Sequence, residues 1–194
     1  VREFLNDGQT IYTAVCASCH GANGQGNRFP GLVPNPSITN PDFLELASDD
    51  YLFTAIQKGR PGRPMLAWGE KENGFTADEM KSLIAYIRGL GGNVQFKPDT
   101  MPQIWAKGDV NFGQKLFTSN CAGCHGKTGE GLEGPALNNK MFLTSVSDTF
   151  LVETISRGRS GTIMQGFSSP SVVRRALTKE EIESIVVYVR SLGK

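Results

Sequence analysis

The sequence is poor in histidine and cysteine and has no long apolar segment. Its 194 residues include two histidines and four cysteines. No apolar run approaches the roughly 18 residues that indicate a membrane-spanning helix. The formal net charge is +1, without the strongly basic balance typical of nucleic-acid-binding domains. We therefore expect no transmembrane segment in this chain and no nucleic-acid partner.

A second absence concerns β-strands, because no segment alternates convincingly between apolar and polar residues. Helical spacing is present instead. Two late segments each begin with a T-x-x-E capping box, at 76–79 and 178–181, and continue with apolar residues at helical spacing. Middle helices are expected to open at Ser48 and Ser147. The sequence predicts an all-α fold.

The chain contains an internal repeat. Aligning Cys16 with Cys121 also pairs Pro30 with Pro135, and further along the chain 51–69 matches 150–168. A period of this length indicates two copies of one domain. The extra residues of the first copy are expected within 33–47 and those of the second within 168–177.

Between the two copies lies a segment rich in glycine, proline and polar residues. This composition is typical of a linker. The sequence therefore predicts a first domain over 1–92, a linker over 93–107 and a second domain over 108–194. The opening residues VREFLNDG lack the pattern of a signal peptide. We expect either a removed leader or a soluble piece of a larger protein.

Two motifs, CASCH at 16–20 and CAGCH at 121–125, use every cysteine and histidine of the chain. A structural zinc site would place its C-x-x-C pairs about 15–20 residues apart, and a thioredoxin-like pair would lie near a βαβ unit. Structural disulfides would leave the following histidines unexplained. The remaining interpretation is covalent haem, because C-x-x-C-H is the attachment motif of haem c.

In this interpretation each domain binds one haem c through two thioether bonds. The attaching residues are Cys16 and Cys19 in the first copy, and Cys121 and Cys124 in the second. The adjacent imidazole then becomes the proximal iron ligand, which is His20 or His125.

The chain resembles the class I cytochrome c domain, twice. The resemblance rests on C-x-x-C-H, a following G-x-x-G-x-G, a proline ten residues after the histidine and a later methionine loop. It implies a two-domain dihaem cytochrome c of the c-four type, located in the bacterial periplasm. It also implies that the carbonyl groups of Pro30 and Pro135 accept a hydrogen bond from His20 and His125. Close crossing of the first and last helices at Gly8 and Gly113 is a further implication.

The distal iron ligands are expected to be Met65 and Met164, because these occupy equivalent positions in glycine-rich loops of the two copies. No histidine or cysteine remains for this role. Met80 lies on an apolar helix face, and Met101 lies in the linker. Met141 aligns with an aspartate. Histidine–methionine ligation raises the reduction potential of a haem.

The function expected is electron transfer between redox protein partners, without substrate chemistry. The alternatives are a haem enzyme resembling thiosulfate dehydrogenases or peroxidases, and the electron-delivery part of a larger, membrane-associated complex. A haem enzyme would need an open or exchangeable distal position, which the methionine pair disfavours.

The two halves differ in charge. Residues 1–93 carry eight basic and ten acidic side chains, whereas 94–194 carry twelve and nine. An acidic redox partner is therefore expected to prefer the second domain, because charge steers encounter. The arginines expected to guide it are Arg157, Arg159, Arg174 and Arg175.

Overall fold

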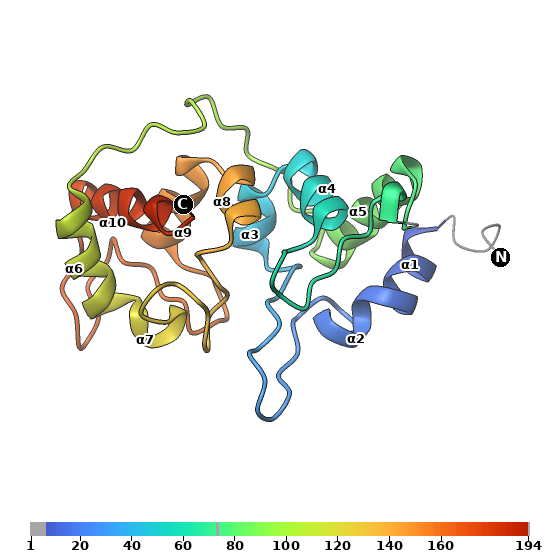
Figure 1. Ribbon diagram of the computed structural model, residues 1–194, viewed down its shortest axis with the longest axis horizontal. Helices are drawn as coiled ribbons and strands as arrows, with labels where there is room; N and C mark the ends of the chain where they lie inside the picture. The colour runs from blue at the N-terminus through green and yellow to red at the C-terminus, as the bar shows by residue number, and fades with distance from the viewer. Residues whose placement is uncertain (1–6, 73, 194) are drawn as a thin grey trace. The chain divides into compact units, whose positions relative to one another are not determined.

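The computed structural model describes residues 7–72 and 74–193, and within these ranges every regular element is a helix (Figure 1). The all-α prediction is confirmed. The first half contains α1 (Gly8–Ile11), the π-helix η2 (Tyr12–Cys16), α2 (Ala17–His20), α3 (Pro41–Leu46), α4 (Asp49–Lys58), the 3-10 helix η3 (Glu70–Glu72) and α5 (Ala77–Leu90). The second half contains α6 (Val110–Asn120), α7 (Ala122–His125), α8 (Lys140–Ser145), α9 (Asp148–Arg157) and α10 (Lys179–Ser191).

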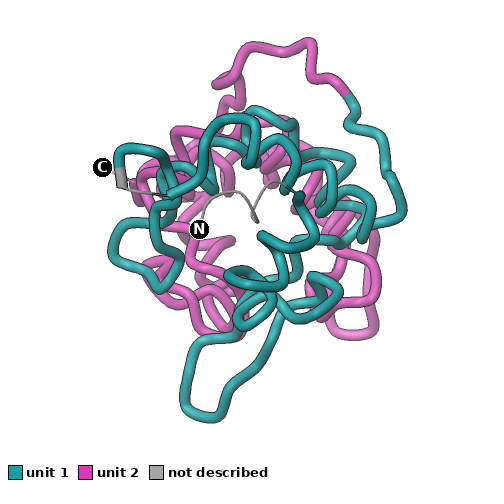
Figure 2. The backbone as a smooth tube through the Cα atoms, turned by 90° about the vertical axis from the view of Figure 1, so that its right-hand side faces the viewer, with its two compact units in different colours: residues 1–97 teal, residues 98–194 magenta. Residues whose placement is uncertain are grey.

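The chain divides into two compact units, 1–97 and 98–194, which Figure 2 colours separately. The division lies inside 93–107, the segment expected to be a linker. Part of this segment is bonded to each unit. The Lys97 amide donates to the Glu45 carbonyl at 2.7 Å, and the Trp105 and Ala106 amides donate to a carboxylate oxygen of Asp148.

The sequence determines where the helices begin through side-chain caps. Both predicted capping boxes are present, with the hydroxyls of Thr76 and Thr178 accepting from the third helical amide of α5 and α10. The middle helices open at Ser48 and Ser147 as expected. A cap of this kind satisfies an amide that the helix itself leaves unpaired.

In the first unit, the N-terminal helix crosses α5 closely. A Cβ placed on Gly8 would lie 2.1 Å from the carbonyl oxygen of Ser82, so only glycine permits this approach. The ring centroids of Tyr12 and Tyr86 lie 5.5 Å apart beside the crossing. The implied crossing is confirmed, and Tyr12 is almost fully buried in the core that it forms.

The second unit repeats this crossing between α6 and α10. A Cβ on Gly113 would lie 2.0 Å from the carbonyl oxygen of Ser184. The rings of Phe117 and Tyr188 lie 5.2 Å apart. Each unit therefore fixes the helix that precedes the cysteine motif against its last helix in the same way.

The first unit carries an extended loop between α2 and α3, which stands clear of that unit's helices in both views (Figures 1 and 2). Asn27 and Asn35 close its base, with the amide of Asn35 donating to the carbonyl of Asn27 at 2.8 Å. The extra residues of the first copy therefore lie in 27–35. The expected placement within 33–47 is wrong.

Candidate haem-binding sites

The two cysteine motifs form the same short turn. In the first unit Cys16 ends η2, and Cys19 and His20 lie in α2. In the second, α6 ends before Cys121, and Cys124 with His125 lies in α7. None of the four cysteines forms a disulfide bond. Each motif thus places two thiols and one imidazole within one or two helical turns.

A glycine-rich turn follows each histidine and folds back over it. The amide of Gly26 donates to the carbonyl of His20 at 2.7 Å, and Gly131 donates to His125 at the same distance. The turn brings a carbonyl group to the imidazole ring. In the second unit this is the predicted partner: His125 Nδ1 lies 2.8 Å from the carbonyl oxygen of Pro135.

In the first unit the expected proline is wrong. His20 Nδ1 lies 3.1 Å from the carbonyl oxygen of Pro36, and Pro30 lies exposed in the extended loop. The physical reason is the position of the inserted residues. Because the insertion falls between Gly26 and Pro36, the proline after the loop occupies the place that Pro135 has in the second unit.

The imidazole rings are held in a form suited to binding a metal ion. Burial lowers the pKa of both His20 and His125, and the hydrogen bond to the proline carbonyl opposes this effect. The lowered pKa favours the neutral ring. A neutral ring that donates from Nδ1 to a carbonyl leaves Nε2 available to a metal.

Gly134 lies against the imidazole of the second unit. A Cβ at this position would lie 2.7 Å from the Cε1 atom of His125. The backbone therefore passes directly over one side of the ring and restricts its rotation. Sequence reasoning missed both Gly134 and Pro36, although the repeat contained a signal for Pro36. Pro36 and Pro135 are separated by the same interval as Met65 and Met164.

The two methionine loops are held by matching backbone bonds. The amide of Arg60 donates to the carbonyl of Met65 at 2.8 Å, and Arg159 donates to Met164 at 2.7 Å. Gly158 precedes the second loop with a φ of 75°, and a Cβ there would lie 2.4 Å from the Met164 carbonyl oxygen. Glycine is thus required both by backbone conformation and by space.

The other three methionines lie elsewhere. Met80 is 2% exposed in the core of the first unit. Met101 is exposed within 93–107, and Met141 lies in α8. Among the described residues, no group of three or more His, Cys, Asp and Glu side chains could hold a metal ion.

These residues fit a covalently attached haem. Each unit presents two unpaired thiols, a neutral imidazole with one nitrogen engaged and the other available, and a methionine loop of fixed backbone. Thiol, imidazole and thioether are the donors that attach haem c and coordinate its iron. The chemistry of the donor set therefore matches the group.

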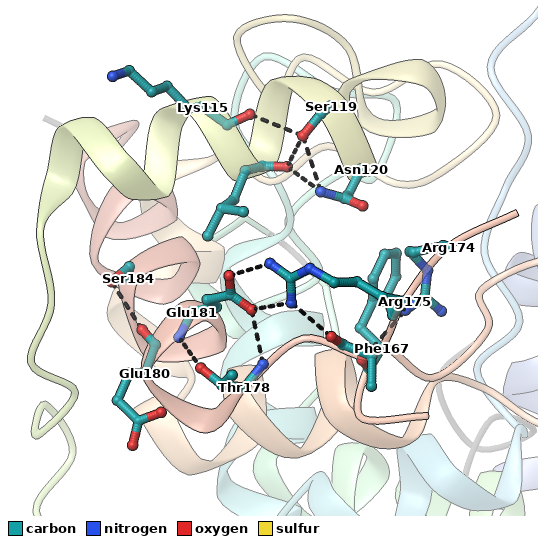
Figure 3. A network of polar contacts seen from close by, with 12 residues as sticks. Lys115, Ser119, Asn120, Phe167, Arg174, Arg175, Thr178, Glu180, Glu181 and Ser184 are labelled. Atoms are coloured by element: carbon teal, nitrogen blue, oxygen red, sulfur yellow. Dashed lines mark hydrogen bonds and ion pairs between the residues drawn. The ribbon is translucent and has the colours of Figure 1, made fainter. Parts of the chain in front are cut away.

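Two of the arginines expected to meet a partner, Arg174 and Arg175, are bonded within their own domain (Figure 3). Arg174 donates to the carbonyl of Gly166 at 2.8 Å. Arg175 pairs with Glu181, which belongs to the capping box of α10. Arg159 donates to the hydroxyl of Thr154 at 2.6 Å. Charge steering by these arginines stays a prediction. The hydrogen bonds described here hold their side chains to groups of their own domain.

No helix among the described residues has the length and apolar character needed to cross a membrane.

Comparison with known families matches each half of the chain separately. Residues 3–87 match the family model described as cytochrome c oxidase, cbb3-type, subunit III. Residues 110–193 match the model described as cytochrome c. The two matches lie in different units of the structure.

Similar proteins include subunits of cbb3-type cytochrome c oxidases. The chain is 33% identical to the FixP subunit of Bradyrhizobium diazoefficiens, covering 96% of this chain and 60% of that protein. It is 30% identical to the CcoP subunit of Azospirillum sp. (strain B510), covering 96% and 61% respectively. The chain thus spans about three fifths of the length of these relatives.

A solved structure shares the fold. The Kuenenia stuttgartiensis reducing HAO-like protein complex contains a chain that aligns with a TM-score of 0.55 at 18% identity, covering 96% of both chains. The sequence matches and the repeated donor geometry agree. The chain therefore consists of two tandem cytochrome c-type domains and is homologous to the CcoP and FixP proteins. Two cytochrome c domains imply two covalently bound haem c groups and support electron transfer.

Proposed function

We propose that this chain is the electron-transferring part of a cbb3-type cytochrome c oxidase subunit, located in the periplasm. Its first iron is held by His20 and Met65 and its second by His125 and Met164. The observation that carries the proposal is the duplicated donor geometry, with a proline carbonyl behind each histidine and an amide fixing each methionine loop. The identity to FixP and CcoP supports the oxidase assignment.

Each bound haem supplies a one-electron couple between ferric and ferrous iron. The residues of the chain hold that couple in place. Cys16 and Cys19 anchor the first porphyrin and Cys121 and Cys124 the second, so that neither group dissociates. The proline carbonyls orient the imidazoles and raise their basicity.

The methionine thioether is a soft donor that favours ferrous iron and raises the reduction potential. With Met65 and Met164 as ligands, neither iron would offer a free coordination position to oxygen or peroxide. The proposed work of the chain is therefore to pass electrons to an oxidase rather than to reduce oxygen itself.

Two measurements on the matured chain test the ligand assignment. Mass spectrometry under denaturing conditions is expected to give the polypeptide plus two haem masses. Met65→Ala and Met164→Ala are each expected to open one iron to carbon monoxide and to lower the potential of that haem alone. Full and rapid carbon monoxide binding by the unchanged ferrous protein would instead favour a haem enzyme.

A genetic test addresses the oxidase assignment. Deleting the gene is expected to remove cytochrome c oxidase activity from membranes of the source bacterium, and the full-length gene is expected to restore it. A copy carrying Cys121→Ala and Cys124→Ala should fail to restore activity. If the deletion leaves that activity intact, the chain is an electron carrier for another acceptor.

A further inference from the structure

The aromatic residue three positions after each methionine is covered differently in the two domains. In the first, the ring of Trp68 stacks on Phe75, with 5.4 Å between centroids and 14° between planes. In the second, the guanidinium of Arg174 lies 4.0 Å from the ring centroid of Phe167. A neutral ring in one domain is thus replaced by a cation in the other.

The surrounding backbone is otherwise equivalent. The amide of Phe75 donates to the carbonyl of Trp68 at 2.8 Å, and Leu177 donates to Phe167 at the same distance. Between these bonded positions lie 69–74 in the first domain and the longer 168–176 in the second. Arg174 lies in this longer segment, and the sequence of 69–74 contains no arginine.

Arg174 is fixed by several hydrogen bonds to the methionine loop and its own segment (Figure 3). Its Nη2 donates to the Gly166 carbonyl at 2.8 Å, and its Nη1 donates to the Phe167 carbonyl at 3.3 Å. Gly166 lies two residues after Met164. A guanidinium can hold several acceptors in one plane, and it also stacks on aromatic rings. Arg174 therefore holds the backbone that follows Met164 in place through the Gly166 and Phe167 carbonyl groups.

The charge of Arg174 is not neutralised by its bonded neighbours. Within the described residues, its acceptors are backbone carbonyl oxygens, whereas the adjacent Arg175 forms a salt bridge with Glu181.

We propose that Arg174 is a positioning residue that braces the Met164 loop, and that its positive charge raises the reduction potential of the second haem. The inference rests on the proposed function, because it takes Met164 as an iron ligand. A nearby cation stabilises ferrous haem relative to ferric haem, since reduction removes one positive charge from the site. The corresponding segment of the first domain carries Glu70, Lys71 and Glu72 instead.

Two substitutions separate charge from bracing. Arg174→Met keeps most of the side-chain volume and removes the charge. Arg174→Lys keeps the charge and removes the planar fork. Arg175→Met is the matched control, because it removes a neighbouring arginine that pairs with Glu181. The measurement is a redox titration of the matured two-haem chain, followed by NMR of the haem methyl groups to separate the two haems.

We expect Arg174→Met to lower the equilibrium constant for reducing the second haem by roughly threefold to tenfold, or about 30–60 mV for a one-electron couple. The first haem should not change. Arg174→Lys should keep the potential but weaken the near-infrared band of methionine-ligated ferric iron and admit carbon monoxide faster. Arg175→Met should change neither the reduction potential of the second haem nor its reactivity with carbon monoxide.

Three results would overturn the inference. They are an unchanged second-haem potential in Arg174→Met, an equal shift at both haems, and an equal shift in the lysine, methionine and control variants. Failure of the ligand assignment is recognised separately, because Met164→Ala would then leave the near-infrared band and the carbon monoxide reactivity of the second haem unchanged. If Arg174→Met does not mature, titration of Arg174→Gln replaces it.

Discussion

Arg190, near the end of α10, donates from Nε to the Oδ1 atom of Asp148 at 2.8 Å, and that carboxylate is almost completely buried. The other carboxylate oxygen accepts the amides of Trp105 and Ala106. One side chain at the start of α9 therefore connects the last helix to the segment that leads into the second domain. In the first domain the equivalent pair is Arg88 and Asp49, but the Asp49 side chain is 68% exposed.

Replacing Asp148 by alanine is expected to destabilise the second domain by about 3 kcal/mol, because it removes a buried carboxylate that holds two backbone amides and leaves the partly buried Arg190 without its counter-charge. Asp49→Ala is the matched control and is expected to cost about 1 kcal/mol or less, since water screens that pair. Hydrogen exchange measures both effects. Protection of the Trp105 and Ala106 amides should fall in Asp148→Ala only, and equal losses in both variants would contradict the interpretation.

Adding a methyl group at the first helix crossing is expected to destabilise the first domain. In Gly8→Ala the new Cβ would overlap the Ser82 carbonyl oxygen, so α1 must move away from α5 at a cost of about 1–3 kcal/mol. Gly89→Ala is the control, because Gly89 lies within α5 where an added methyl group would contact no neighbouring element. It should stabilise by about 0.4–1 kcal/mol. Denaturant unfolding compares the two, and a stabilising Gly8→Ala would refute the close crossing.

Shortening the extended loop tests the assignment of Pro36. Replacing 27–35 by the sequence of 132–134 leaves Pro36 and its bond to His20 in place. We expect the first haem to keep its potential and its resistance to carbon monoxide. Stability should change by about 1 kcal/mol or less, because loop-closure entropy varies slowly with length. Loss of the first haem's methionine ligation would show that the loop, with Pro30, supports the site.

Acid stability of the second domain is expected to depend on Arg175 and Glu181. Hydrogen bonds from Arg175 lower the pKa of Glu181 from its ordinary 4.5 to about 2. A carboxyl group with a depressed folded-state pKa stabilises the domain above pH 4.5, and this contribution is lost as the pH falls toward 2.

Arg175→Gln should raise the pKa of Glu181 toward its ordinary value. The variant should therefore be less stable than the parent near neutral pH, with the difference shrinking toward pH 2. NMR titration of the Glu181 carboxyl and unfolding at several pH values measure both effects. A difference in stability that is constant across this range would exclude the ion pair as its cause.

The sequence by itself determined the helical fold and the repeat, and it predicts the haem-attaching residues. These features are local: capping boxes, apolar spacing and the C-x-x-C-H motif each depend on residues within a few positions of one another. The helix crossings at Gly8 and Gly113 could also be predicted from the sequence, because the family resemblance pairs a glycine with an aromatic residue at fixed spacing. The prediction that Cys16, His20, Cys121 and His125 hold the haems therefore needs only their order along the chain.

Tertiary structure decided which distant groups meet. The partner of His20 depends on where the first domain accommodates its extra residues, and a sequence match of Pro30 with Pro135 could not reveal that Pro36 returns to the imidazole. Arg174 and Arg175 have the same charge and are adjacent in sequence, yet one stacks on Phe167 while the other pairs with Glu181. Composition gives the charge of each residue, but only the folded backbone places its carbonyl, ring and carboxylate partners within bonding distance.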